Sequence, residues 1–541
     1  MRPRLLALVL ATLGVAGALL LHGAPVAGQA KATAPAPKSG GVLNVAQRED
    51  TPQGFAIHET STVSTTWPAM PCFNNLVLFD PLKQRESADT VIGELAEKWS
   101  WQDNYRNLVF FLRRNVKWHD GQPFTSKDVK FTFDMLREGP DAAGKLRINP
   151  RKDWYVNVQN VEAPDPYTVI FHLKRPQPAL LLMMASGYTP IYAAHVPPAQ
   201  YRTACVGTGP YKLKEWRKGE FIEYVRNPDY FVKGRPYLDG IRYVVIKERG
   251  TRVAALQAGQ VDTAFPGDTS KTTAEQLKKA VPQMVFTRAA ENVNENMIMN
   301  TKKPPFDNPK VRIAVSHAID RRGLNQAVHQ GGSTIGISMP SPPWGVWGVP
   351  EKDLNAIAGY GKAADEKAKA KKLMAEAGQA NGFTVKCMVI PTFPTMMSGG
   401  PVIAQQLKRI GITMEIEQVE YAIWIKRWQA HDFDMTLNST PGYADPDVAF
   451  FRALHSTKGQ NWNSWKVPEV DALLEEGRKT MDAKKRKEIY DKVQIAILEN
   501  VPHLWLYSAD LIDFTQANVK GFRQHPTALL YGLEGASIDK V

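Results

Sequence analysis

His119 and Asp120 are the first residues whose types and spacing could do chemistry, because a histidine beside an aspartate can act as a general base with an orienting acid. They stand in the segment Trp118-His119-Asp120-Gly121. Adjacent residues of a strand point to opposite faces, however, and Asp-Gly is a frequent turn dipeptide. We therefore interpret this segment as a turn and not as a catalytic dyad.

The sequence lacks the common motifs of enzymes and metal sites. It contains no G-x-x-x-x-G-K-[ST] phosphate loop, no H-E-x-x-H zinc helix and no G-x-S-x-G nucleophile elbow. The 11 histidines form no H-x-H or Cys/His cluster, so we expect neither a metal site nor a cofactor. Nothing in the sequence favours an enzyme, and a secreted hydrolase is kept only as a remote alternative.

The first thirty residues have the pattern of a secretory signal peptide. Arg2 and Arg4 form a basic start, residues 5–21 are apolar and uncharged, and Gly28 and Ala30 are the small side chains that signal peptidase requires. We expect cleavage after Ala30, with an uncleaved membrane anchor as the alternative. No later segment approaches ~20 uninterrupted apolar residues, so the exported protein is expected to be soluble.

The charge balance of the 541 residues is basic. The chain has 67 Lys and Arg against 54 Asp and Glu, and loss of two arginines with the signal peptide leaves 65 against 54, an excess of 11. Export makes nucleic acid an unexpected partner, so we interpret the excess as a property of the surface, of docking or of anionic ligands.

Three cysteines, Cys72, Cys205 and Cys387, allow at most one disulfide within the chain. A Cys72–Cys205 bond is one candidate, and buried unpaired cysteines are the alternative.

Strand and helix patterns alternate along the chain, with more strands in the first half. There we expect strands at 42–46, 107–112, 167–173, 241–246 and 261–265, a hairpin over 211–226, and helices at 125–136, 180–184 and 251–258. In the second half we expect helices at 309–319, 363–377, 402–410, 421–430, 468–480 and 483–499, and strands at 383–390, 412–419, 433–437 and 503–507. This alternation is typical of a mixed α/β protein with at least two lobes.

A series of short motifs, spread over residues 40–521, resembles one family. In order they are Gly40-Gly41-Val42-Leu43, Leu95-Ala96-Glu97-Lys98-Trp99, the run from Val116 to Val129, Val206-Gly207-Thr208-Gly209-Pro210-Tyr211, Asn227-Pro228-Asp229-Tyr230-Phe231, the run from Leu256 to Asp262, Asn300-Thr301, the run from Pro305 to Arg312, Ala318-Ile319-Asp320 and Asp445-Pro446-Asp447. Together, behind a signal peptide, they resemble the extracytoplasmic solute-binding proteins of ABC importers, specifically the peptide/nickel-type family 5.

The resemblance implies a two-lobed periplasmic binding protein fold of type II with an inserted subdomain. The expected parts are a signal peptide at 1–30, a flexible lead-in at 31–40, lobe I at 41–75, 187–291 and 505–541, the inserted subdomain at 76–186 and lobe II at 292–504. The ligand would lie between the lobes, which close on it by hinge bending. The expected protein is a periplasmic monomer without a cofactor or covalent chemistry, and its partners are ABC permease subunits with a cytoplasmic ATPase.

The resemblance also suggests which residues hold the ligand. From lobe I, Glu59, Thr60 and Ser61 follow the first strand, where family members line the cleft. From lobe II, the stretch that begins at Asn438 follows another strand and includes Tyr443 and Asp445. For Asp445 the alternative is an Asp-Pro turn that caps a helix.

Aromatic residues form the second group of candidates. Trp344 and Trp347 stand in a proline-rich loop that could present two indoles to a ligand. Trp424 is also a candidate, although its spacing of four from Trp428 is more typical of a core stripe on a helix than of a ligand site.

One position departs from the family. Its peptide-binding members have an aspartate for the peptide's α-ammonium three residues before the acid of the Asp-Pro pair, and Gly442 stands there in this chain. Either Asp445 or another acid replaces that carboxylate, or the ligand has no free N-terminus.

The leading functional prediction is a receptor for a peptide or a similar polar organic solute. The alternatives are a receptor for a sugar, an opine-like compound or a metal chelate, the secreted hydrolase, and an envelope chaperone.

Overall fold

A computed structural model describes residues 37–541, apart from 61, 84, 141, 336–338, 355–356, 358, 392, 442–443, 458–460, 462, 523–532 and 540–541. The predicted signal peptide and residues 31–36 of the predicted lead-in therefore lie outside the described residues. Within the described part of the chain, no helix is long and apolar enough to cross a membrane.

The first sheet combines the N-terminal strand with strands from about 200 residues later. Its order is β1-β10-β9-β8, in which β1 and β10 are parallel and the other pairs antiparallel. The strands are β1 (Val42–Gln47), β8 (Tyr211–Arg217), β9 (Phe221–Arg226) and β10 (Gly240–Val245). The neighbouring helices are α1 (Val63–Ala69), α4 (Arg249–Gln257) and α5 (Lys271–Ala280), with short strand pairs β2 (Val77–Phe79) with β3 (Val91–Gly93) and β18 (Val519–Lys520) with β19 (Ser537–Ile538).

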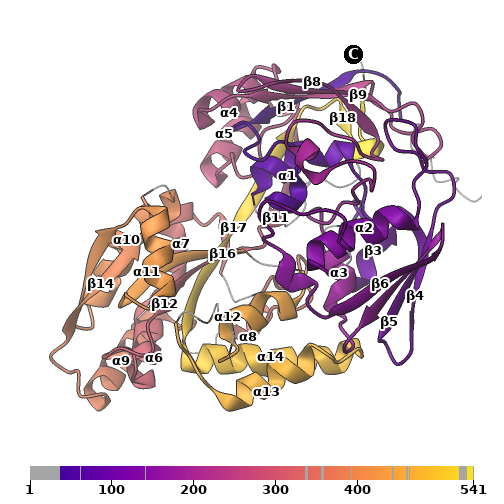
Figure 1. Ribbon diagram of the computed structural model, residues 1–541. Helices are drawn as coiled ribbons and strands as arrows, with labels where there is room; N and C mark the ends of the chain where they lie inside the picture. Colours follow the sequence, from indigo (N-terminus) through magenta and orange to yellow (C-terminus); the bar gives the residue numbers. More distant parts are fainter. Residues whose placement is uncertain are drawn as a thin grey trace, which may run out of the picture. The chain divides into compact units, whose positions relative to one another are not determined.

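The second sheet lies entirely within the predicted inserted subdomain. It is antiparallel, in the order β4-β5-β7-β6, and is accompanied by two helices (Figure 1). Their bounds are β4 (Ala96–Gln102), β5 (Asn107–Leu112), β6 (Val158–Asp165), β7 (Thr168–Leu173), α2 (Ser126–Arg137) and α3 (Ala179–Ala185). The predicted capping box opens α2, since the Asp128 carboxylate accepts a 2.8 Å hydrogen bond from the Thr125 backbone N–H.

The third sheet belongs to the second half of the chain. Its order is β11-β17-β12-β16-β14-β15, with β13 also paired to β17. β14 is parallel to β15 and to β16, and α10 connects β14 to β15, which confirms the predicted βαβ pattern. The strands are β11 (Val285–Ala290), β12 (Val293–Met299), β13 (Ser333–Ile335), β14 (Phe383–Val389), β15 (Ile412–Gln418), β16 (Met435–Pro441) and β17 (His503–Thr515). The helices are α6 (Pro309–Ala318), α7 (Arg321–His329), α8 (Glu351–Leu354), α9 (Ala363–Glu376), α10 (Pro394–Lys408), α11 (Tyr421–Gln429), α12 (Arg452–Leu454), α13 (Pro468–Gly477) and α14 (Ala483–Asn500).

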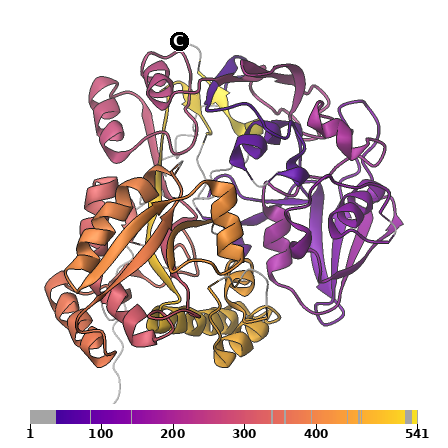
Figure 2. The ribbon, with the colours of Figure 1, turned by 60° about the vertical axis from the view of Figure 1, so that its left-hand side comes forward.

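β17 is shared between two hydrophobic cores. Its first half pairs with β12 and contributes Leu504 and Leu506 to the core around β14 and α10, whereas its second half pairs with β11 and contributes Ile512 and Phe514 to the core around α4 and α5. Figure 1 and Figure 2 show this strand as a long yellow ribbon that connects the two regions. The chain makes the same passage again at residues 291–292, between β11 and β12.

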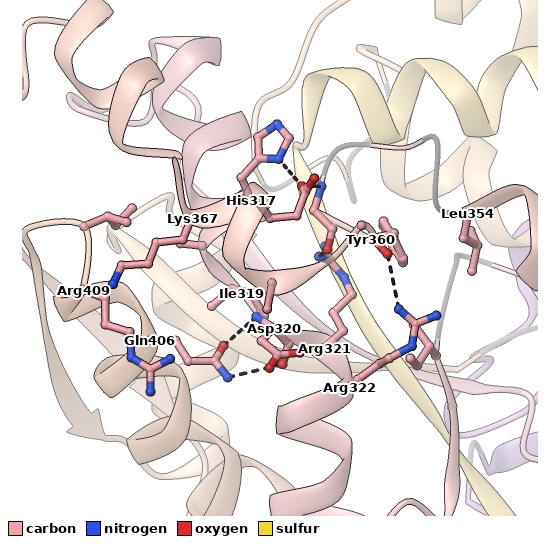
Figure 3. A pocket seen from close by; sticks show the side chains of 17 residues that line it. His317, Ile319, Asp320, Arg321, Arg322, Leu354, Tyr360, Lys367, Gln406 and Arg409 are labelled. Carbon is pink, nitrogen blue, oxygen red and sulfur yellow. Dashed lines mark hydrogen bonds and ion pairs between the residues drawn. The ribbon is translucent and has the colours of Figure 1, made fainter. Parts of the chain in front are cut away.

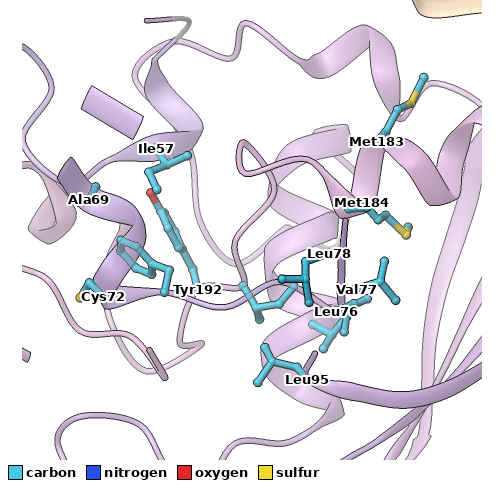
Figure 4. Packing of buried hydrophobic residues seen from close by; sticks show 14 of the residues in the cluster. Ile57, Ala69, Cys72, Leu76, Val77, Leu78, Leu95, Met183, Met184 and Tyr192 are labelled. Atoms are coloured by element: carbon cyan, nitrogen blue, oxygen red, sulfur yellow. The ribbon is translucent and has the colours of Figure 1, made fainter. Parts of the chain in front are cut away.

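The largest core joins the first sheet to the inserted sheet. Figure 4 shows part of it, with Ile57, Ala69, Cys72 and Tyr192 on one side of the view and leucine and methionine side chains on the other. Cys72 and Cys205 form a disulfide across 133 residues of sequence, so the candidate pairing is confirmed. Cys387 is buried and free, and burial raises the pKa of its thiol to about 12.

Most predicted elements exist, but the strand expected at 261–265 is wrong. This segment makes only isolated bridges from Thr263, to Val45 on one side and to Thr515 on the other. Thr263 forms a backbone bridge to each of two sheets, but its neighbours do not continue the pairing on either side. The apolar run is therefore buried without forming a strand.

Candidate functional site

A cavity of about 790 Å³ lies among residues that are far apart in the sequence. This volume is within the range of small-molecule sites in proteins, roughly 300–1,000 Å³. Its described lining residues are Thr62, Val63, Glu291, Val293, Glu295, Ile390, Phe393, Met396, Tyr421, Trp424, Ile425, Trp428, Asn438, Ser439, Val448, Ala449, Phe450, Arg452, Ala453, Leu454, His503 and Trp505.

The cavity takes residues from both halves of the fold. Thr62 and Val63 come from the start of α1, where the Thr62 hydroxyl caps the helix by accepting a hydrogen bond from the Ser64 backbone N–H at 3.2 Å. The other lining residues come from β12, α10, α11, β16, α12, β17 and the segments beside them. A ligand in this cavity therefore contacts segments that belong to different cores.

Aromatic side chains of α11 form one wall. The rings of Tyr421 and Trp424 stack with centroids 6.0 Å apart, and Trp424 and Trp428 have centroids 4.7 Å apart. Trp424 is also a core residue, because it is almost fully buried and its indole N–H donates a 2.7 Å hydrogen bond to the Thr436 hydroxyl. The core stripe predicted from the spacing of four therefore also lines the cavity.

Two carboxylates line the cavity at the passage between β11 and β12. Glu291 and Glu295 are partly exposed, and Val293 between them lines the cavity too. Alternate residues of a strand share a face, which explains why 291, 293 and 295 lie together. Burial raises the pKa of both carboxyls to about 7, and the neighbouring Glu295 charge adds to the effect on Glu291.

Three further polar side chains line the cavity. Arg452 of α12 is partly exposed, and its guanidinium is 3.7 Å from the carboxylate of Asp153 in the predicted inserted subdomain. His503 and Trp505 alternate with the core residues Leu504 and Leu506 on β17, so they face the other side of the sheet. Burial lowers the pKa of His503 to about 4, which keeps the imidazole neutral at pH 7.

Of the residues proposed from the sequence, Trp424 and Asn438 line the cavity. Glu59 does not, because it is fully buried and its carboxylate is paired with the Arg202 guanidinium at 2.7 Å. The Thr60 hydroxyl donates a 2.9 Å hydrogen bond to Gln53 and lies outside the cavity lining. Ser61 and Tyr443 lie outside the described residues, as does Gly442.

The remaining candidates, Asp445, Trp344 and Trp347, do not line the cavity. Asp445 is buried in an ion pair with Arg486, and it also accepts a hydrogen bond from the Asp447 backbone N–H at 2.9 Å, as in the helix-capping alternative. The Trp347 indole donates a hydrogen bond to the Ala444 carbonyl at 3.1 Å, and Trp344 is half-buried; neither lines the cavity.

The structure confirms the turn at His119 and Asp120. The Gly121 N–H bonds to the Trp118 carbonyl at 2.9 Å, and Gly121 has a positive φ of 91°. The Asp120 carboxylate contacts His195 and not its neighbour His119.

A much smaller pocket, about 50 Å³, lies at the start of α7 (Figure 3). Its polar groups are largely paired with one another: the Gln406 amide bonds to the backbone of Asp320, and Glu366 accepts a hydrogen bond from His317. Its volume is suited to a water molecule and not to an organic solute. The larger cavity is therefore the candidate ligand site.

Comparison with known proteins agrees with this geometry. The family model described as "Bacterial extracellular solute-binding proteins, family 5 Middle" matches residues 90–462. The chain belongs to this family. The resemblance found in the sequence motifs is thereby confirmed, and the fold is the two-lobed periplasmic binding protein fold.

Individual relatives of this family 5 protein cover almost its whole length. It is 27% identical to the oligopeptide-binding protein AppA of Bacillus subtilis, over 93% of each chain, and 25% identical to the dipeptide-binding protein of Escherichia coli, over 88% of this chain and 91% of the other. The solved structure of the B. subtilis protein in complex with a nonapeptide has a TM-score of 0.72, with 26% identity over 93% of this chain and 100% of the other.

The site residues that the sequence did not suggest include Glu291, Glu295, Arg452, His503 and Trp505. The sequence contains one indication for Glu291 and Glu295. The two acids are four residues apart and stand just before the apolar run Met297-Ile298-Met299, which is typical of a strand. The others stand in segments whose neighbours in space are set by the fold alone.

Proposed function

We propose that this family 5 protein is the extracytoplasmic receptor of an ABC importer, and that it binds a peptide or a similar polar organic solute in the 790 Å³ cavity. The observation that carries this proposal is the composition of the cavity wall, in which α1 of the first half meets β12, α11 and β17 of the second. Closure of lobes around a ligand requires contacts from both, because only differential contacts shift the equilibrium between open and closed states.

The names of the relatives support the class of solute. Proteins of similar length and sequence are described as binding oligopeptides, dipeptides and, in one solved structure, a nonapeptide. The cavity's mix of aromatic walls and a few charged groups suits a ligand with an apolar body and polar ends. The further parts of the proposal are a cleaved signal peptide, a monomeric protein in the periplasm, and delivery of the solute to permease subunits without covalent chemistry.

The hinge of this receptor would lie where the chain passes between cores, at residues 291–292 and in the middle of β17. Two strand connections allow bending with few broken contacts. The lobe boundary predicted at 291–292 coincides with the first passage, whereas the one predicted at 504–505 lies before the middle of β17, since Leu506 still belongs to the core around β14 and α10. Both boundaries remain part of the proposal.

The proposal is tested by purifying the protein gently from its own host, denaturing it and analysing the released molecules by mass spectrometry. We expect one class of organic solute at about one molecule per chain. The recovered solute should then raise the melting temperature of the emptied protein, because a ligand at ~100 times its Kd adds about 2.7 kcal/mol to stability. Turnover of the solute, or stoichiometric protection of unfolded clients, would instead support the hydrolase or the chaperone.

A further inference from the structure

We propose that Glu291 and Glu295 form a subsite for a cationic group of the solute, an ammonium or a guanidinium, at the β11–β12 end of the cavity. This inference rests on the proposed function, because it assigns a chemical class to the solute in the same cavity.

The first argument is the lack of a protein counter-charge. Among the described residues, neither carboxylate has a Lys or Arg within ion-pair distance, and the neutral Thr395 hydroxyl donates a 3.1 Å hydrogen bond to Glu295. Some buried carboxylates elsewhere in the fold do have such a partner, as Asp268 has in Arg252 and Asp445 has in Arg486. Two desolvated acids next to each other are unfavourable unless a cation joins them.

The second argument is the sign of the charge in the cavity. The chain as a whole has an excess of basic residues, yet the described charged residues that line the cavity are two glutamates against one arginine. His503 adds no positive charge at pH 7. The cavity is thus an acidic exception within a basic protein, which favours a cation over an anion.

The aromatic wall of the cavity suits the same ligand. Tyr421, Trp424 and Trp428 present ring faces and edges close to one another, and a cation over such a ring gains electrostatic attraction. Asp445, the acid first considered from the sequence, is not available, because Arg486 holds both of its oxygens at 2.6 Å. The glutamate pair is therefore the acidic group that can meet a free amine of the solute.

The test uses paired probes that differ in one charge. The first pair is a tripeptide library with free N-termini and the same library with acetylated N-termini; the second is arginine against citrulline, which has the same shape without the charge. Binding to the full mature chain is measured by thermal shift and calorimetry. The first pair reports an α-ammonium, and the second reports a basic side chain.

We expect the cationic member of at least one pair to bind at least about tenfold more tightly, which is typical of a hydrogen bond to a charged group. The double variant Glu291→Gln/Glu295→Gln should reduce that preference to less than about threefold and leave the neutral probe unaffected. Glu415→Gln, the same change at an exposed position on β15, should keep the preference. Glu295→Asp, which retains the charge, should keep part of it.

The inference is overturned if the neutral members bind as tightly as the cationic ones, if the double variant keeps the preference, or if no cationic probe binds. The receptor function has its own readout, the solute released on denaturation. An uncharged or anionic solute recovered at one molecule per chain would therefore contradict the cation subsite and still support the receptor proposal.

Discussion

Asp445 and Arg486 form a buried, two-pronged ion pair in which each carboxylate oxygen is 2.6 Å from a guanidinium nitrogen. Burial disfavours the charge of Arg486, but the adjacent Asp445 carboxylate holds its pKa above the ordinary value. The Arg486 Nε also donates to the Gly477 carbonyl at 2.9 Å, so the pair connects the segment after β16 to α13 and α14. An acid that a sequence motif suggests for ligand binding therefore has a structural role here.

Removal of Asp445 should destabilise the fold and leave the cavity intact. We expect Asp445→Ala to lower the free energy of unfolding by about 3–5 kcal/mol, because Arg486 is left buried without a counter-charge. The control is Asp432→Ala, which breaks an exposed ion pair to Arg427 and should cost less than about 1 kcal/mol. Urea unfolding measures both. A near-normal stability of Asp445→Ala, combined with lost solute binding, would return Asp445 to the ligand site.

Tyr421 should contribute to binding and little to stability. Its side chain is 51% exposed, yet it lines the cavity and stacks on Trp424 and Phe393. We expect Tyr421→Ala to weaken binding of the solute recovered from the protein by about tenfold, the size of a moderate aromatic contact, with an unchanged melting temperature. Trp344→Ala, outside the cavity lining, is the matched aromatic control, and calorimetry compares the two. Equal affinity in both variants would show that α11 does not form the wall.

The acid pair predicts a specific pH dependence of stability. The pKa values of Glu291 and Glu295 are about 7 in the fold, against 4.5 for an ordinary glutamate. Between pH 4.5 and 7 the native protein thus binds more protons than the unfolded chain, so these groups make stability fall as pH rises. We expect the double Gln variant to be more stable than wild type at pH 8, by an amount on the order of 1–3 kcal/mol, with the gain disappearing below pH 4.5.

The groups that face Glu291 and Glu295 do not titrate between pH 4.5 and 7 in the native protein, so they do not mask the effect of the two glutamates on stability. Burial raises the pKa of Tyr507, across from Glu295 on β17, and His503 titrates near pH 4, just below that range. Thr395 donates a hydrogen bond from α10 and does not titrate. Chemical unfolding at pH 4, 6 and 8 compares the double variant with wild type and with Glu415→Gln. A gain that is the same at all three pH values would mean that the two carboxyls titrate normally.

The cysteines predict a simple thiol count. Because Cys72 and Cys205 are bonded and Cys387 is buried with a raised pKa, Ellman's reagent should find no reactive thiol in the native protein and one after denaturation without reductant. Reduction should lower stability by about 2–5 kcal/mol, since the bond closes a long loop. Three thiols in the denatured, unreduced protein would show that the disulfide does not form.

The sequence predicted elements well where the pattern is local. The α10 crossover between β14 and β15 follows from hydrophobic periodicity, and the start of α2 follows from the spacing of Thr125 and Asp128. The failure at 261–265 has a different cause, because an apolar run is equally consistent with a strand and with a buried connection. Only the position of Thr263 between two sheets decides between them.

The site was less predictable than the fold. Trp424 and Asn438 were found because they follow or belong to recognisable elements, whereas Arg452 and His503 come from segments about 50 residues apart that only tertiary packing brings to one cavity. Glu59 shows the opposite error. An acid after the first strand looks suited to a ligand, but Arg202, 143 residues later, pairs with it and buries it.

The most direct test of the central claim is a crystal structure of the protein with the solute that it releases on denaturation. We predict density for one solute molecule inside the 790 Å³ cavity, in contact with Thr62 or Val63 on one side and with the aromatic wall of α11 on the other, and with a cationic group beside Glu291 and Glu295. Density for the solute elsewhere on the chain, with this cavity empty, would contradict the account.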